Sequence, residues 1–322
     1  MAPDISSVTS SCVTASDLIG TRIPLGITDL DSHALFTGPA PDRLFHYTTL
    51  NGLRGIVESK SLWLTRTAYL NDRSELKDAI SLFQSEANIW ASNLEAANVD
   101  VADLLTTTAT QLDSFHETHI CLASFCEDGD LLSQWRGYGG SGSGVALGFS
   151  GQTLERVNRT GWAKLLRCLY DTNEHRQVIR DLIRLLIKGY ETWKKVVSSE
   201  KHASIRKELI GYFNTTFLQV APALKNMHFA AEKEWRIVTL PRSTVDPKFR
   251  SFLSNERVSQ YYIYEFEPAP TGDYDFLPSV VIGPTSEPRL VADAVGTLCS
   301  QSKVGFNEMV FSQIPYRGTT CL

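Results

Sequence analysis

A block with helical periodicity, from about residue 174 to 226, interrupts a chain whose other apolar runs are short. Its apolar stripe, with basic residues between, comprises Ile179, Leu182, Ile183, Leu186, Ile187, Tyr190 and Trp193. This spacing places the apolar side chains on one face of a helix. The short runs elsewhere, bounded by polar or glycine-rich segments, are typical of strands. The pattern predicts an α+β fold: a mixed β-sheet core with large helical insertions.

The short runs define the expected elements. The predicted strands cover residues 44–48, 62–65, 119–125, 145–149, 165–170, 234–240, 261–266, 280–282 and 309–311. Thr49 is a suitable N-cap for a helix that follows the first strand. Asp72 and Glu75 have the spacing of a capping box at the start of a long helix. Pro288 suits the first turn of another helix.

Composition sets the domain plan and limits the function classes. Residues 1–40 are rich in Ser, Thr, Pro and Gly, which predicts a poorly ordered N-terminal segment; a secretion signal of a bacterial effector is the alternative. Residues 41–322 are long enough for a single α+β domain, with the helical insertion at about 174–226. The net charge of −5 argues against a broad basic face for nucleic acid, but not against a local basic groove.

Targeting and metal signals are weak. No apolar run is long enough for a membrane helix, and the N-terminus has no secretory signal pattern. The six cysteines are scattered, which predicts free thiols and a cytoplasmic protein. His119 and Cys121 share one face of a strand, but Cys126 has the opposite parity. We therefore expect no metal site there.

A glycine-rich segment, residues 137–144, follows Trp135 and Arg136. It leads into a strand rather than a helix, which excludes a dinucleotide-binding fingerprint. Two alternatives remain: a simple turn, or a nest of backbone N–H groups for a phosphate, helped by Arg136. Trp135 and Tyr138 are either core residues or a clamp for a nucleotide.

His46 and Glu234 begin the two most informative segments. Glu234 stands at the head of a predicted strand, after Glu232 and Lys233. A carboxylate there faces a cleft that the sheet borders, or forms an ion pair with Lys233 or Arg236. A single His on a strand, such as His46, is more often structural than catalytic.

Several short motifs in order resemble an uncharacterised bacterial family, a domain of unknown function. They are Phe45-His46-Tyr47-Thr48, Leu62-Trp63-Leu64-Thr65, Leu70-Asn71-Asp72 with Glu75, Leu132-Ser133-Gln134-Trp135-Arg136-Gly137-Tyr138-Gly139, Glu232-Lys233-Glu234-Trp235-Arg236 and Ile314-Pro315-Tyr316-Arg317. They span roughly residues 44 to 317. Membership of such a family implies no activity.

The order of His46-x-Thr48, a helix, a short strand, an aromatic residue and a late Glu232-x-Glu234 is similar to His-Tyr-Glu ADP-ribosyltransferases. This resemblance implies an ADP-ribosyltransferase-like fold that binds NAD. It implies that His46 and Thr48 orient NAD and that Glu234, beside Glu232, stabilises the cationic sugar. The middle aromatic is best matched by Tyr69, with Trp63 and Tyr138 as competitors.

The chemistry fits such a site, since a fixed carboxylate stabilises an oxocarbenium-like sugar. Arg136 is then the expected partner of the pyrophosphate. The first hypothesis is an enzyme that cleaves NAD and transfers ADP-ribose to a macromolecule or to water, as a toxin, defence or effector protein. The second is a non-catalytic module of a bacterial conflict system that binds a nucleotide or nucleic acid through Trp135, Arg136 and Tyr138.

Overall fold

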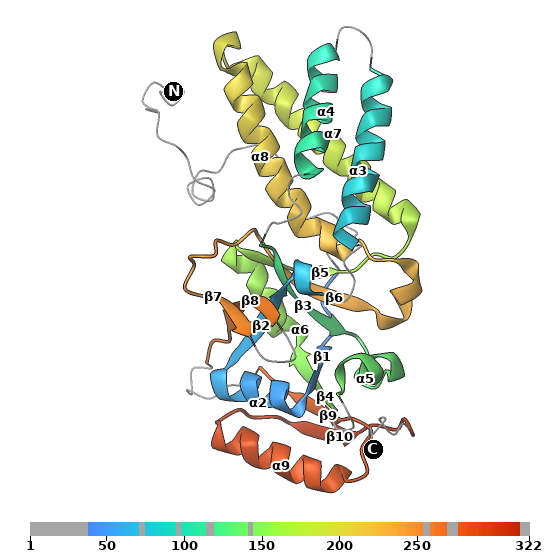
Figure 1. Cartoon of the computed structure of the whole chain (residues 1–322), viewed down its shortest axis with the longest axis vertical. Helices are drawn as coiled ribbons and strands as arrows, with labels where there is room; N and C mark the ends of the chain where they lie inside the picture. The colour runs from blue at the N-terminus through green and yellow to red at the C-terminus, as the bar shows by residue number, and fades with distance from the viewer. Residues whose placement is uncertain are drawn as a thin grey trace.

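A computed structural model describes residues 38–70, 75–94, 98–113, 119–140, 144–253, 258–268 and 276–315 of the chain. A branched, mixed β-sheet occupies the middle and lower part of the molecule in Figure 1, and four long helices stand at its upper end. This arrangement confirms a mixed sheet with helices inserted in blocks. The predicted N-terminal segment 1–40 lies almost entirely outside the described residues.

The sheet has ten described strands. They are β1 (Arg43–Thr49), β2 (Ser61–Arg66), β3 (Cys121–Cys126), β4 (Gly144–Ser150), β5 (Ala163–Arg167), β6 (Glu234–Thr239), β7 (Phe249–Leu253), β8 (Val258–Glu265), β9 (Ser279–Ile282) and β10 (Glu308–Phe311). Their main order is β10-β9-β4-β1-β3-β2-β8-β7, and β6 and β5 branch from β3. All pairs are antiparallel except β9 with β10.

Strand β3 is the branch point of the sheet. One of its edges pairs with β6 over residues 122–126. The other edge is shared: Cys121 and Leu122 pair with β2, whereas Cys126 pairs with Phe45 of β1. Between these contacts β1 and β2 diverge, so the sheet is split along this edge of β3.

The helical block is larger than the predicted insertion. The described helices are α2 (Leu50–Ser59), α3 (Glu75–Ser92), α4 (Val99–Asp113), α5 (Leu132–Tyr138), α6 (Gly151–Glu155), α7 (Thr172–Val196), α8 (His202–Val220) and α9 (Pro288–Gln301). Helices α7 and α8 confirm the helical prediction for about 174–226, but α3 and α4 pack against them. The block therefore combines two separate segments of the chain.

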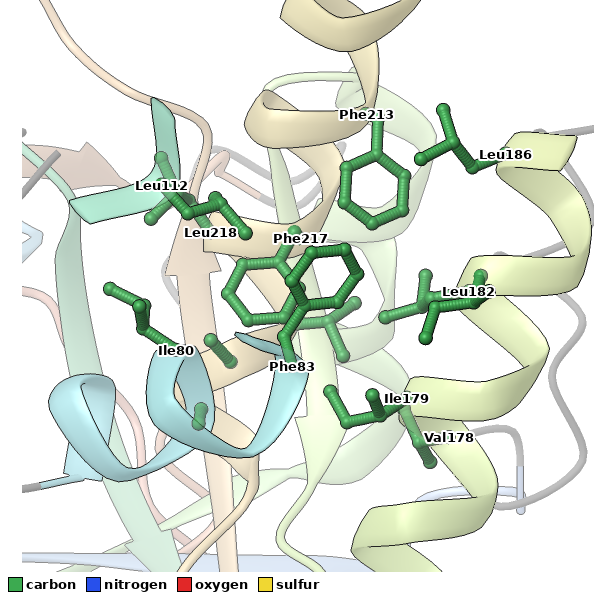
Figure 2. Close-up of a cluster of buried hydrophobic side chains, with 14 of the residues drawn as sticks. Ile80, Phe83, Leu112, Val178, Ile179, Leu182, Leu186, Phe213, Phe217 and Leu218 are labelled. Atoms are coloured by element: carbon green, nitrogen blue, oxygen red, sulfur yellow. The ribbon is translucent and has the colours of Figure 1, made fainter. Parts of the chain in front are cut away.

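A separate apolar core holds this block together. Phe83 of α3 packs against Phe213 and Phe217 of α8, with ring centroids 5.2 and 5.4 Å apart. Leu182 and Leu186 of α7 close the cluster from the side (Figure 2). Burying large apolar side chains of this kind stabilises each by about 1.5–3 kcal/mol. The core extends to Leu122 of β3 and Val238 of β6, which joins the block to one face of the sheet.

The two faces of the sheet have different neighbours. One face packs on a second core with α2, α6 and α9. The other is covered in part by the helical block and in part by α5, which packs on β1. Its third part, formed by β2, β8 and β7, exposes Trp63 and Phe252.

Two predictions that depend only on neighbouring residues, a helix N-cap and a proline in a first helical turn, are confirmed. The Thr49 side chain accepts a hydrogen bond from the Gly52 N–H at the start of α2, and Pro288 occupies the first turn of α9, as expected. The capping-box prediction at Asp72 lies outside the described residues. Helices α4 and α5 and strand β7 were not predicted from the sequence.

Candidate functional site

Glu234, at the head of β6, lies in a buried network of charges. Its side chain is 4% exposed, and both carboxylate oxygens are engaged by cations. Arg236 donates from Nε to Oε1 at 2.7 Å and from Nη2 to Oε2 at 3.1 Å. Lys225 also bonds Oε2 and reaches Glu232 at 2.6 Å. Glu234 therefore has no oxygen left without a cationic partner.

The same network crosses from the sheet to the helical block. Arg236 bonds the buried carboxylate of Glu75, in the first turn of α3, through Nη1 and, at 3.0 Å, through Nη2. It also donates to the Pro222 carbonyl, which follows α8. Three elements distant in sequence thus meet at one guanidinium, which presents its donors in a rigid fork. This geometry is that of a structural clamp.

The protonation states follow from burial and charge. Burial alone raises the pKa of Glu234, but the charges of Arg236 and Lys225 outweigh it and hold this pKa at about 2. Burial raises the pKa of Glu75, and Arg236 opposes the shift only in part. Burial lowers the pKa of Lys225, yet Glu234 and Glu232 raise it above its usual range. Near neutral pH, Glu234 is thus an anion between two cations.

His46 lies at the split of the sheet. Its Nδ1 is 2.9 Å from the Ser124 carbonyl oxygen, on the stretch of β3 between its contacts with β1 and β2. Its ring is tilted against Phe125, with centroids 5.8 Å apart. Burial lowers the pKa of His46, and the bond to Ser124 opposes this in part. A neutral His46 that donates to this carbonyl satisfies a backbone group that the divergence of β1 and β2 leaves outside the ladder.

The predicted pair His46 and Glu234 does not line one cleft. Phe45, Cys126 and Glu234 are aligned across β1, β3 and β6, so their side chains share a face. His46, one residue on from Phe45, points to the opposite face. The expectation that the two side chains meet is therefore wrong. The reason is register, since a shift of one residue reverses a side chain's face.

The three candidates for the middle aromatic are scattered. Tyr69 is half-buried in a short turn after β2, beyond the Cys121 end of β3, whereas Glu234 pairs at the Cys126 end. Tyr138, 47% exposed, ends α5. Trp63 belongs to the open part of the sheet. Of the predicted NAD contacts, Thr48 shares the face of His46, and Glu232 binds Lys225.

Trp135 is buried, so it is not a free stacking platform. Its ring meets Tyr47 edge-on at 4.7 Å, and its Nε1 donates to Asp130 at 2.7 Å. Asp130 also accepts from Ser312 Oγ at 2.5 Å and from the Gln313 N–H at 2.8 Å. Asp130 thus links the segment after β10 to Trp135 of α5. The neighbouring Arg136 is exposed, and the phosphate-nest prediction falls partly on residues 141–143, outside the described residues.

The open part of the sheet carries the most accessible aromatic group. Trp63 of β2 stacks on Tyr261 of β8 with centroids 3.9 Å and planes 11° apart. Phe252 of β7 lies 6.0 Å from Trp63, with its ring tilted by 51°. The exposed Arg250 of β7 is paired in register with Tyr261 and shares its face. We call these four residues the aromatic face.

Of the aromatic face, only Trp63 was a predicted site residue. The predicted strand 261–266 includes Tyr261, but the prediction gave this residue no role. Strand β7, most of whose residues are exposed, was not predicted. Phe252 and Arg250 lie near Trp63 because β8 stands between β2 and β7 in the sheet. The sequence alone does not reveal this strand order.

Neither a cluster of metal ligands nor a membrane-spanning helix occurs in the part of the chain that the structure describes. Among the residues that the structure describes, no three His, Cys, Asp or Glu side chains gather as metal ligands. The four described cysteines are buried free thiols. No helix in the described ranges has the length and apolar character needed to cross a membrane.

Comparison with known protein families finds one family model that matches part of the chain. The model of a family described as a protein of unknown function (DUF2971) matches residues 134–237. This range contains the Gln134-Trp135-Arg136 motif and the Glu232–Arg236 motif, so it confirms the resemblance to an uncharacterised family. No curated protein and no solved structure matches the chain.

Proposed function

We propose that this chain is a non-catalytic binding module that recognises nucleobases of a nucleotide or nucleic acid through the aromatic face. The observation that carries the proposal is the stacked pair Trp63–Tyr261 on an open sheet surface, with Trp63 45% exposed. Large aromatic side chains are usually buried or engaged with a partner. Base stacking on exposed aromatic residues of a sheet is a common mode of recognition.

The alternative grip through Trp135 has less support. Trp135 is 2% exposed and its indole N–H is already bonded to Asp130. Arg136 and Tyr138 are exposed at the surface of α5, and each has interactions of its own. The aromatic face therefore replaces Trp135 as the proposed contact with bases.

Calorimetry with AMP, NAD, ADP-ribose and single-stranded oligonucleotides tests this function. We expect at least one base-containing ligand to bind, and Trp63→Ala to abolish that binding. Leu290→Ala is the matched control, because Leu290 is 67% exposed on α9, which packs near the β10–β9 end of the sheet, opposite the β8–β7 end. The proposal fails if no ligand binds, or if Trp63→Ala binds as well as the unmodified chain.

An NAD-cleaving transferase is the second candidate. One observation favours it: His46 lies on β1, the first strand that the structure describes, where the resemblance places the His. The ion pairs of Glu234 and its place on the opposite face weigh against it. Nicotinamide release from NAD tests it. Release that is lost in both His46→Ala and Glu234→Gln, with the fold intact, favours the transferase; no release with acceptors supplied removes it.

A further inference from the structure

We infer that the aromatic face takes a single strand of nucleic acid, with successive bases on Trp63 and Phe252, rather than a free nucleotide or a duplex. This inference rests on the proposed function and narrows its ligand. Trp63 and Tyr261 are nearly parallel and in contact, so each ring covers one side of the other. Trp63, the more exposed of the two, is the first stacking plane for a base.

Phe252 offers a second plane. It is tilted by 51° from Trp63, so one flat base cannot lie parallel to both rings. Two neighbouring bases fit these planes only if they are turned relative to each other. A flexible single strand permits that turn, whereas the bases of a duplex are parallel and enclosed. The two planes therefore favour two consecutive unpaired bases.

The positive charges on the aromatic face suit contact with a short stretch of the nucleic-acid backbone. Arg250 precedes Phe252 by two residues on the same side of β7, where it can reach a phosphate between the two bases. Lys248 adds a second cation nearby, but it is paired with Glu265 at 2.6 Å. Two cations predict a weak salt dependence, with a slope of log K on log salt of about −0.7 for each phosphate contacted.

A protein partner is the rival occupant, and a second copy of the chain is its simplest form. The exposed Leu253 and Val258 at the end of the β7–β8 pair add apolar area next to the face. The stacked rings beside an arginine favour bases over such a partner. Self-association that Trp63→Ala abolishes would overturn the inference.

Fluorescence anisotropy of the full chain with labelled oligothymidylates, from one to about ten nucleotides, tests the inference. We expect an oligonucleotide to bind clearly more tightly than the mononucleotide. A duplex of equal length is expected to bind at least about tenfold more weakly than the single strand. Trp63→Ala and Phe252→Ala are each expected to weaken oligonucleotide binding about tenfold, and Leu290→Ala to leave it unchanged. Arg250→Gln is expected to reduce the magnitude of the salt slope by about 0.7.

The outcomes separate the two claims. A mononucleotide that binds as tightly as the oligonucleotide, with loss in Trp63→Ala, keeps the proposed function and overturns the inference. Duplex binding equal to single-strand binding overturns it as well. If no mononucleotide, single strand or duplex binds, both the proposed function and the inference fail. Trp63→Phe, which keeps the ring, guards against a folding artefact: it must retain most of the affinity that Trp63→Ala loses.

Discussion

His46 and Glu234 point to opposite faces of the sheet, with β3 between their strands. Each has a local structural role. His46 bonds the Ser124 carbonyl at the split, and Glu234 forms ion pairs with Arg236 and Lys225 at the junction with the helical block. Both residues thus have a structural role, so substitution of either is expected to change the stability of the fold.

Removing the Glu234 charge is expected to destabilise the fold. Glu234→Gln leaves Arg236 and Lys225 with only Glu75 and Glu232 as anionic partners, and breaking a buried ion pair costs about 3–5 kcal/mol. Chemical denaturation measures this loss. The matched control is Glu308→Gln, because the exposed pair of Glu308 with Arg43 contributes about 0–1 kcal/mol. Equal, small losses for the two variants would contradict the clamp.

The His46 environment predicts a pH dependence. Burial lowers the pKa of His46 in the folded chain below its ordinary value of 6.5. The unfolded chain therefore binds the proton first, so stability is complete above about pH 6.5 and falls as the pH decreases. In His46→Gln, whose amide can still donate to Ser124, this part of the slope should vanish. Unfolding measured at several pH values between about 7.5 and 5 decides the point. Parallel profiles for the two proteins would refute it.

The low pKa of Glu234 acts in a more acidic range. Its folded value of about 2 lies below the ordinary value of 4.5, so its stabilisation is present above pH 4.5 and is lost as the pH falls toward 2. Acid unfolding of Glu234→Gln should therefore be less steep in this range than that of the unmodified chain. A steeper acid transition in the variant would contradict the assignment.

Asp130 is expected to hold the segment after β10 in place. Asp130→Ala removes the acceptor for Trp135, Ser312 and Gln313, and hydrogen bonds to a charged group contribute about 1.5–3 kcal/mol each. Hydrogen exchange should accelerate at Gln313 more than in the helical block. The exposed Asp42→Ala serves as control. Unchanged exchange at Gln313 would show that other contacts fix this segment.

The sequence predicts the fold where the signals are local. The Thr49 cap, the Pro288 turn and the apolar stripe of α7 all depend on neighbouring residues, and each is confirmed. Helix α4 was missed because threonines separate its buried leucines, and threonine has a low helix propensity. The packing of α4 on α3 and α8 outweighs that propensity.

The candidate sites depend on strand order and register, which one sequence does not reveal. The pattern predicted the strands of both His46 and Glu234, but not that Cys126 aligns Glu234 with Phe45. For the same reason Trp63 was recognised without Tyr261 and Phe252. The ion pair of Glu234 with Arg236 was predicted as an alternative, since Arg236 stands two positions after Glu234 on the same strand face. The partners Lys225 and Glu75 were not predicted.

Photocrosslinking of a bromouracil-containing single strand to the full chain, mapped by mass spectrometry, tests the central claim most directly. The claim is that bases stack on the aromatic face. The account predicts crosslinks to Trp63, Tyr261 or Phe252, and their loss in Trp63→Ala. Crosslinks confined to α5, at Arg136 or Tyr138, would contradict it.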